Sequence, residues 1–261
     1  MPLEALLKRD RVIVLAGLAG LAGLAWGYMI SEARTMSLTG VCCCAGLKMS
    51  RPDVNSWPAS TLLPLFLMWA EMMVAMMLPS AAPMILTFAT VNRTRREREQ
   101  PFVPVSLFLA GYLAVWTGFS ALAAVAQWAL HATALLSSMM VSTSSLLGGS
   151  LLIAAGLFQW TPLKNACLSH CRSPLSFLLS DWREGRWGAF AMGLKHGAYC
   201  TGCCWFLMAL LFVAGVMNMW WVAAIAMFVL VEKVVPKGTW VARGAGVTLV
   251  AWGIWMVLAT R

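Results

Sequence analysis

One apolar run contains most of the chemically reactive side chains of this chain, and it constrains the fold more than any other feature. Residues 188–215, GAFAMGLKHGAYCTGCCWFLMALLFVAG, are long and apolar enough to cross a bilayer as a helix. At 100° per residue, the soft donor side chains of this run share about a third of the helix circumference. These residues are Met192, His196, Cys200, Cys203 and Cys204. The stripe predicts a metal site within a membrane helix.

The spacing within the stripe suits coordination of a single ion. Cys200 and Cys203 lie about 4.5 Å apart along the helix axis, and His196 lies about one turn away. The alternative is that the cysteines only pack, since free cysteine behaves as a small hydrophobe and small residues are common between membrane helices. Ionisable residues at membrane depth are costly, and this favours the functional interpretation.

The composition places the chain among polytopic membrane proteins. Hydrophobic residues make up 61% of the sequence, charged residues 11%, and the mean hydropathy is +0.77. We therefore expect an all-α fold, a polytopic transmembrane helical bundle that forms a single integral membrane domain over residues 1–261. The apolar runs predict about seven spans, at residues 12–30, 62–91, 103–130, 146–160, 188–214, 219–235 and 244–260.

The basic residues predict the orientation of this bundle rather than a nucleic-acid partner. The formal net charge is +9, but the basic side chains lie in short loops between the apolar runs. We therefore exclude nucleic-acid binding. With a cytoplasmic N-terminus, the basic segments 92–100, 161–187 and 233–243 all fall on the cytoplasmic side, as the positive-inside rule requires.

The second apolar run carries an acidic residue among methionines. A carboxylate at the depth of Glu71 needs a cation, a proton or a hydrogen-bonding network. Pro79 and Pro83 predict a kink with freed backbone carbonyls. The surrounding methionines wrap the helix, so flexible packing is an equal alternative to metal binding; they are Met72, Met73, Met76 and Met77. Since Glu71 and Cys200 lie at similar depth, we hypothesise that their helices touch.

Two further cysteine groups lie outside the membrane runs. Thr161-Pro162 predicts the start of a short helix on which Cys167 and Cys171 lie one turn apart. This pair could pass or hold a metal, or be a reduced structural pair. The adjacent cysteines 42–44 could form a disulfide, capture an ion or be inert, and the sequence leaves these interpretations open.

Four spaced motifs resemble one family. They are MWAEMMVAMMLPSAAPM at 68–84, QWTPLKNACLSHCRSPL at 159–175, GLKHGAYCTGCCWFLM at 193–208 and EKVVPKG at 232–238. Together they resemble the uncharacterised bacterial family of predicted metal-binding integral membrane proteins, some members of which are labelled copper chaperones. The resemblance implies a bacterial cytoplasmic (inner) membrane location and assigns these residues to the family motifs: Glu71, Met72, Met73, Met76, Met77, Cys167, Cys171, His196, Cys200, Cys203, Cys204, Glu232 and Lys233.

The leading functional hypothesis is binding and trafficking of a soft transition metal, Cu(I) before others. Thiols and thioethers favour this ion, and a metal-donor or metal-acceptor protein would be the partner. Cys200, Cys203 and His196 would be first ligands, with Glu71 or Lys195 balancing charge. No Walker motif supports ATP-driven pumping. One alternative is a membrane thiol–disulfide oxidoreductase that uses the C-x-x-C pair Cys200 and Cys203; another is an accessory subunit of a larger membrane complex.

Overall fold

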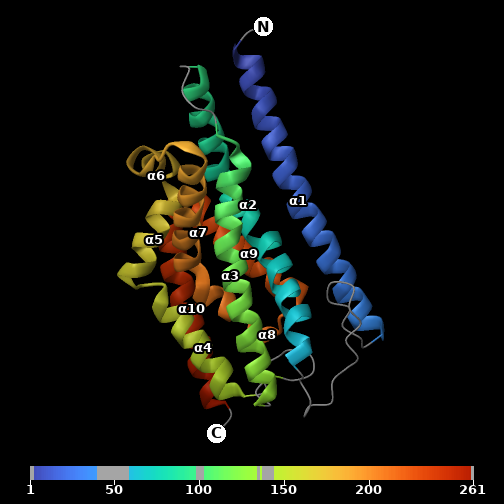
Figure 1. Cartoon of the computed structure of the whole chain (residues 1–261). Coiled ribbons are helices and arrows are strands. Elements are labelled where there is room, and N and C mark those ends of the chain that lie inside the picture. The colour runs from blue at the N-terminus through green and yellow to red at the C-terminus, as the bar shows by residue number, and fades with distance from the viewer. Residues whose placement is uncertain (1–2, 40–58, 98–102, 134–135, 137–143, 260–261) are drawn as a thin grey trace.

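The fold is a bundle of helices, and the elements within the described residues are all helical. The computed structural model describes residues 3–39, 59–97, 103–133, 136 and 144–259, so the cysteine triplet at 42–44 lies outside the described residues. The helices are α1 (Leu3–Thr39), η2 (Ala59–Thr61), α2 (Leu62–Glu97), α3 (Val105–Ala132), α4 (Ser145–Phe158), α5 (Pro162–Arg172), α6 (Pro174–Asp181), α7 (Gly185–Ala209), α8 (Leu211–Ala214), α9 (Met219–Val234) and α10 (Gly238–Leu258) (Figure 1). The all-α prediction is confirmed.

The number of membrane-length helices is lower than the sequence predicts. Within the described residues, five helical segments are long and apolar enough to cross a membrane: Arg11–Thr35, Ala59–Arg95, Val105–Ala132, Gly185–Ala214 and Gly238–Leu258. Helices α4 and α5 meet at a bend of 65° and add a sixth if they form one broken span. The difference lies in two short helices, α4 with 14 residues and α9 with 16 residues. They reach about 21 Å and about 24 Å, less than a hydrocarbon core of about 30 Å.

Helix α3 packs against both α2 and α7. Glycines bring the backbones of α3 and α7 into contact. A Cβ atom on Gly193 would lie 2.0 Å from the carbonyl oxygen of Phe108, and one on Gly111 would lie 2.2 Å from that of Phe190. Gly149 and Gly253 play the same role between α4 and α10. The close approach of α3 and α7 sets the cysteines of α7 directly against α3.

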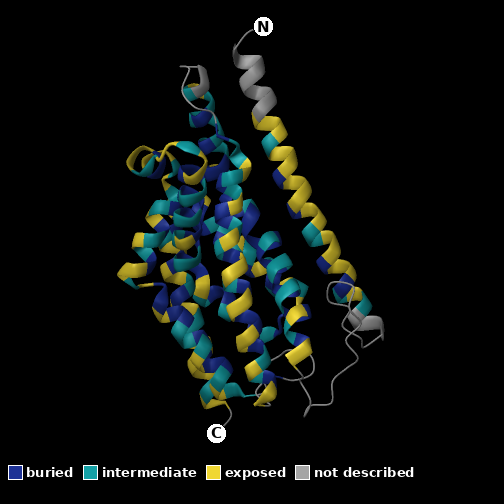
Figure 2. Ribbon diagram, in the orientation of Figure 1, coloured by how far each residue is buried: buried dark blue, intermediate teal, exposed yellow. Residues whose placement is uncertain are grey.

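Helix α1 packs along α2 on the outside of the bundle, and its outward face is largely exposed (Figure 2). Pro79 lies within α2 and has no N–H group, so the carbonyl of Ala75 loses its helical partner. The indole Nε1 of Trp26 donates to this carbonyl oxygen over 3.0 Å. The carbonyl freed by Pro79, which the sequence predicts, is therefore satisfied by a side chain of α1.

Candidate metal centre

The soft stripe of α7 faces the interior of the bundle. Its side chains lie against α3 and α5, the two helices that pack most closely on α7. All of them are buried, with exposed fractions of 2% or less: Met192, His196, Cys200, Cys203 and Cys204. The geometry of α7 therefore places every donor of the predicted stripe out of reach of solvent.

Cys200 is the point where four helices converge. Its sulfur lies 3.2 Å from the hydroxyl of Tyr112 on α3 and accepts a hydrogen bond from the Lys233 ammonium of α9 over 3.0 Å. The same ammonium donates to Ser80 Oγ on α2 over 2.9 Å. A cation beside a cysteine favours the thiolate, which is the form that binds metals.

Three more thiols surround Cys200. Cys203 and Cys204 each donate to the backbone carbonyl of Cys200 over 3.0 Å. Cys171, from α5, interacts with the sulfur atoms of Cys200 and Cys203. All four cysteines are free and buried, and we refer to Cys171, Cys200, Cys203 and Cys204 as the thiol cluster.

The chemistry of the thiol cluster fits a soft monovalent ion, but the cluster is not preformed as a site of three or more ligands. Thiolates are ligands that favour Cu(I). Among the residues that the structure describes, no group of three His, Cys, Asp or Glu side chains converges in a way that could hold a metal ion. The reason is visible in the rotamers, since Cys203 and Cys204 turn their thiols toward a backbone carbonyl. Coordination by three thiols would require these side chains to rotate.

His196 lies beside the thiol cluster in an aromatic cage. Its ring stacks near Tyr112, Phe108 and Phe177 at centroid distances of 5.6, 6.0 and 5.8 Å. Its Nδ1 is buried without a hydrogen-bond partner. One ring nitrogen is therefore available as a ligand, while the cage fixes the plane of the ring.

The two predicted cysteines of α5 differ in their surroundings. Cys171 belongs to the thiol cluster, whereas Cys167 is half-buried, one turn earlier on the helix. The sulfur of Cys167 lies against α7 at Gly202, where an added Cβ would approach it to 2.9 Å. Helix α5 therefore carries one thiol within the cluster and a second thiol nearer the surface.

The structure does not bring Glu71 to the thiol cluster. Glu71 lines a cavity of about 380 Å³ between α1, α2 and α3, together with Tyr28 and Trp116, and no cysteine lines this cavity. One carboxylate oxygen is buried without a partner. Lys195, the other residue predicted to balance charge, forms an ion pair of 2.5 Å with Asp181.

The predicted methionines of α2 are core residues. All four are buried, with exposed fractions of 2% or less: Met72, Met73, Met76 and Met77. Met77 is linked to the site through its backbone, because its carbonyl accepts from Tyr112 over 3.1 Å and from Ser80 over 2.9 Å. The methionine side chains thus pack in the core of the bundle, and the carbonyl of Met77 links α2 to Tyr112.

Lys233 is a site residue whose contact with Cys200 the sequence did not predict. Its signal was present, since EKVVPKG was one of the resemblance motifs, but the spacing gave no reason to direct this lysine toward Cys200. The preceding residue, Glu232, forms a fully buried ion pair of 2.7 Å with Lys164. Lys164 also donates to Gln159, at the end of α4.

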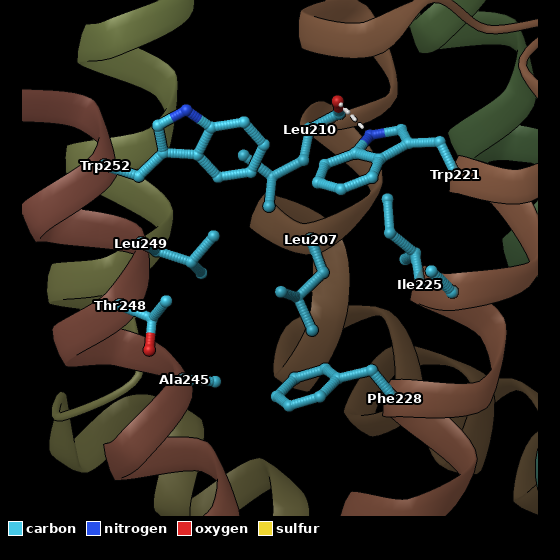
Figure 3. Close-up of a pocket in the computed structure, with 10 residues that line it drawn as sticks. Leu207, Leu210, Trp221, Ile225, Phe228, Ala245, Thr248, Leu249 and Trp252 are labelled. Atoms are coloured by element: carbon cyan, nitrogen blue, oxygen red, sulfur yellow. Dashed lines mark hydrogen bonds between the residues drawn. The ribbon is translucent and has the colours of Figure 1, made fainter. Parts of the chain in front are cut away.

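A separate apolar pocket of about 270 Å³ opens between α7, α9 and α10. Trp221 and Trp252 lie on opposite sides of its upper part, and the hydroxyl of Thr248 and the two indole nitrogens are the polar side-chain atoms drawn among the labelled lining residues (Figure 3). The indole of Trp221 donates to the carbonyl of Leu210 over 2.8 Å. No cysteine lines this pocket, so it is distinct from the thiol cluster.

These features define a helical protein with several membrane-length helices and a thiol cluster, together with a lysine, buried among them. A family model, PpoB2, described as copper chaperone, matches residues 66–256. The chain therefore belongs to this copper chaperone family. The matched region contains the whole thiol cluster and Lys233, while α1 lies outside it. Comparisons with curated proteins and with solved structures found no match.

Proposed function

We propose that this protein binds Cu(I) at the thiol cluster within a membrane and delivers it to a partner protein. The observation that carries the proposal is the gathering of four free, buried thiols from α5 and α7, one of which, Cys200, accepts a hydrogen bond from a buried ammonium. The family description supports copper handling. Copper is the cargo in this account, so each step below concerns what the side chains of the chain do.

The ligand roles follow from the contacts. Cys200 and Cys203 are the first ligands, and Cys171 brings a third thiol from α5. On binding, Cys203 would release its thiol proton to solvent and give up the weak hydrogen bond that this proton makes to a carbonyl, and its thiolate would bind the metal. Auxiliary donors are Cys204, His196, Met72, Met73, Met76 and Met77. Glu71, which lies in a separate cavity, has no direct role in this site.

The membrane setting extends the same proposal. The apolar helices support insertion in the bacterial cytoplasmic membrane with a cytoplasmic N-terminus. The half-buried Cys167, one turn from Cys171, provides the outer thiol through which copper reaches the cluster. A metal-donor or metal-acceptor protein would therefore dock near α5.

Thiol–disulfide exchange is the weaker alternative. A redox C-x-x-C pair must be reached by a partner thiol, but the exposed fractions of Cys200 and Cys203 are 0% and 1%. All cysteines within the described residues are free. The buried position of the pair favours retention of an ion over exchange with a second protein.

Copper analysis of the detergent-purified protein tests the proposal. The protein is loaded with Cu(I) under reducing conditions, and the copper content is compared between wild type and a Cys200→Ser/Cys203→Ser/Cys204→Ser variant. We expect near-stoichiometric copper in wild type and its loss in the variant. The matched control removes the same number of thiols elsewhere, as Cys42→Ser/Cys43→Ser/Cys44→Ser, and should retain copper.

Two outcomes would overturn the proposal. One is wild-type protein that retains no copper, and the other is equal copper in wild type and the Cys200/Cys203/Cys204 variant. Thiol counting on the same samples distinguishes the redox alternative, because a disulfide between Cys200 and Cys203 in the isolated protein would support exchange chemistry instead.

A further inference from the structure

Lys233 is a buried cation whose charge is not matched by a carboxylate. Only 8% of this residue is exposed, and its ammonium contacts Ser80 Oγ and Cys200 Sγ. In the part of the chain that the structure describes, no carboxylate forms an ion pair with Lys233, and the adjacent Glu232 is paired with Lys164 over 2.7 Å. The thiol cluster is therefore the place where negative charge can balance Lys233.

The charge of the loaded site decides which ion suits it. Two thiolates and one monovalent cation carry a single negative charge, which the Lys233 ammonium neutralises. Two thiolates and one divalent cation are already neutral, so the same ammonium leaves the site with a net positive charge. Because a net charge in a low-dielectric interior is costly, the first complex is the more stable one in this environment.

The preformed geometry supports the use of two thiolates. No set of three His, Cys, Asp or Glu ligands converges within the described residues, so a third thiolate would require side-chain rotation. Soft ions that are stable with two thiolates in a linear arrangement, such as Cu(I), Ag(I) and Hg(II), therefore need fewer side chains to turn than ions that require three or four ligands. Among these ions, charge is the property that distinguishes Hg(II) from the other two.

We propose that Lys233 is a specificity-determining residue that selects monovalent over divalent soft ions at the thiol cluster. This inference rests on the proposed function, because it assumes that the thiol cluster binds the ion. Lys233 acts through its fixed charge and not as a ligand, since an ammonium has no lone pair to donate. The hydroxyl of Ser80 accepts from the ammonium over 2.9 Å and so holds it in position beside Cys200.

A competition between Ag(I) and Hg(II) tests this assignment. The background variant is Cys42→Ser/Cys43→Ser/Cys44→Ser, so that thiols outside the described residues do not bind either ion. The ratio of the two bound metals is measured by mass spectrometry for this background, for Lys233→Leu and for Lys233→Arg. Leucine removes the charge without adding a thioether, and arginine retains the charge.

We expect Lys233→Leu to lower the bound Ag(I) to Hg(II) ratio by at least about 100-fold, in line with the cost of removing one partner of a buried charge pair. Lys233→Arg should restore most of the ratio. The matched control is Lys237→Leu, the same substitution at an exposed lysine of the adjoining segment, and it should leave the ratio unchanged. Because both ions compete within the same folded protein, partial loss of protein lowers both signals and does not move the ratio.

An unchanged ratio in Lys233→Leu, with both ions still bound, would overturn the selectivity role while leaving the proposed function intact. If the background protein binds neither ion, the thiol cluster is not a metal site and both proposals fail. The two failures are thus distinguished within one experiment.

Discussion

The hydroxyl of Tyr112 lies 3.2 Å from Cys200 Sγ and donates to the carbonyl oxygen of Met77 over 3.1 Å. One side chain of α3 therefore joins α7, which carries three of the four thiols of the thiol cluster, to α2. A tyrosine hydroxyl has one proton and can donate to only one acceptor at a time. When Cys200 binds a metal, its sulfur carries negative charge, and the hydroxyl can turn its proton toward that sulfur.

Replacing Tyr112 with phenylalanine should weaken copper binding. The variant removes the one hydroxyl that can donate to a metal-bound Cys200, and a hydrogen bond to a charged group contributes about 1.5–3 kcal/mol. We expect Cu(I) affinity to fall by about 10- to 100-fold in competition with a Cu(I) chelator. Tyr199→Phe is the control, because its ring stacks on His170 outside the thiol cluster. Equal affinity in wild type and Tyr112→Phe would show that the hydroxyl only links α2 to α3.

Helical periodicity was sufficient to predict the inward face of α7. The side chains of the stripe from Met192 to Cys204 share one face because an α-helix has 3.6 residues per turn. Thiols and imidazole are costly to expose to lipid, so this face is expected to point inward, and every member of the stripe is buried. Apolar run length likewise predicted the helices, and it gave the bounds of α9 to within one residue, 219–235 against Met219–Val234. It counted this helix as a membrane span, although 16 residues are short for that length.

Contacts between helices could not be read from the same patterns. Glu71 and Cys200 lie at similar calculated depth, but depth does not specify the direction in which a side chain points around its helix, and Glu71 lies in a cavity against α1 and α3. Lys233 follows a long apolar run, and only the three-dimensional packing of α9 directs its ammonium to Cys200. The same packing brings Cys171 of α5 to the thiols of α7.

The close contact between α3 and α7 predicts that Gly193 does not tolerate a larger side chain. Alanine at Gly193 would place its Cβ 2.0 Å from the carbonyl oxygen of Phe108, so the two backbones must separate. Overpacking of this kind costs about 1–3 kcal/mol, and it moves Tyr112 away from Cys200. We expect Gly193→Ala to lower both the thermal unfolding temperature and Cu(I) affinity.

The matched control for this prediction is Gly118→Ala. Gly118 also lies on α3, but an added Cβ meets no atom within 4 Å. This substitution should leave copper binding unchanged and should not lower the unfolding temperature, because alanine favours helix more than glycine does. If both variants behave alike, the backbone contact at Gly193 does not hold the site together.

The two cysteines of α5 should give different kinetic signatures. Cys171 interacts with Cys200 and Cys203, so Cys171→Ser should lower equilibrium Cu(I) affinity and speed copper release to a chelator. Cys167 is half-buried and lies outside the thiol cluster, so Cys167→Ser should slow copper loading while leaving the equilibrium affinity near the wild-type value. Stopped-flow loading and equilibrium competition on the same samples separate the two effects. A loss of affinity in Cys167→Ser would make it a ligand and contradict its role as an outer thiol.

The ion pair between Lys164 and Glu232 should be costly to break from one side only. Both side chains are 1% exposed and their charged atoms lie 2.7 Å apart. Lys164→Met leaves the Glu232 carboxylate buried without its cation, a change that typically costs about 3–5 kcal/mol. We expect a marked fall in thermal unfolding temperature for Lys164→Met, and a similar fall for Glu232→Leu.

The double variant Lys164→Met/Glu232→Leu separates the two contributions to this cost. It removes both charges together and replaces them with apolar side chains, which is often neutral for stability. We expect it to recover most of the unfolding temperature lost by either single variant. Because Glu232 is adjacent to Lys233 on α9, we also expect Cu(I) binding to fall in either single variant and to recover in the double variant. Additive losses would contradict the pairing, because the interaction between these two charges can be lost only once.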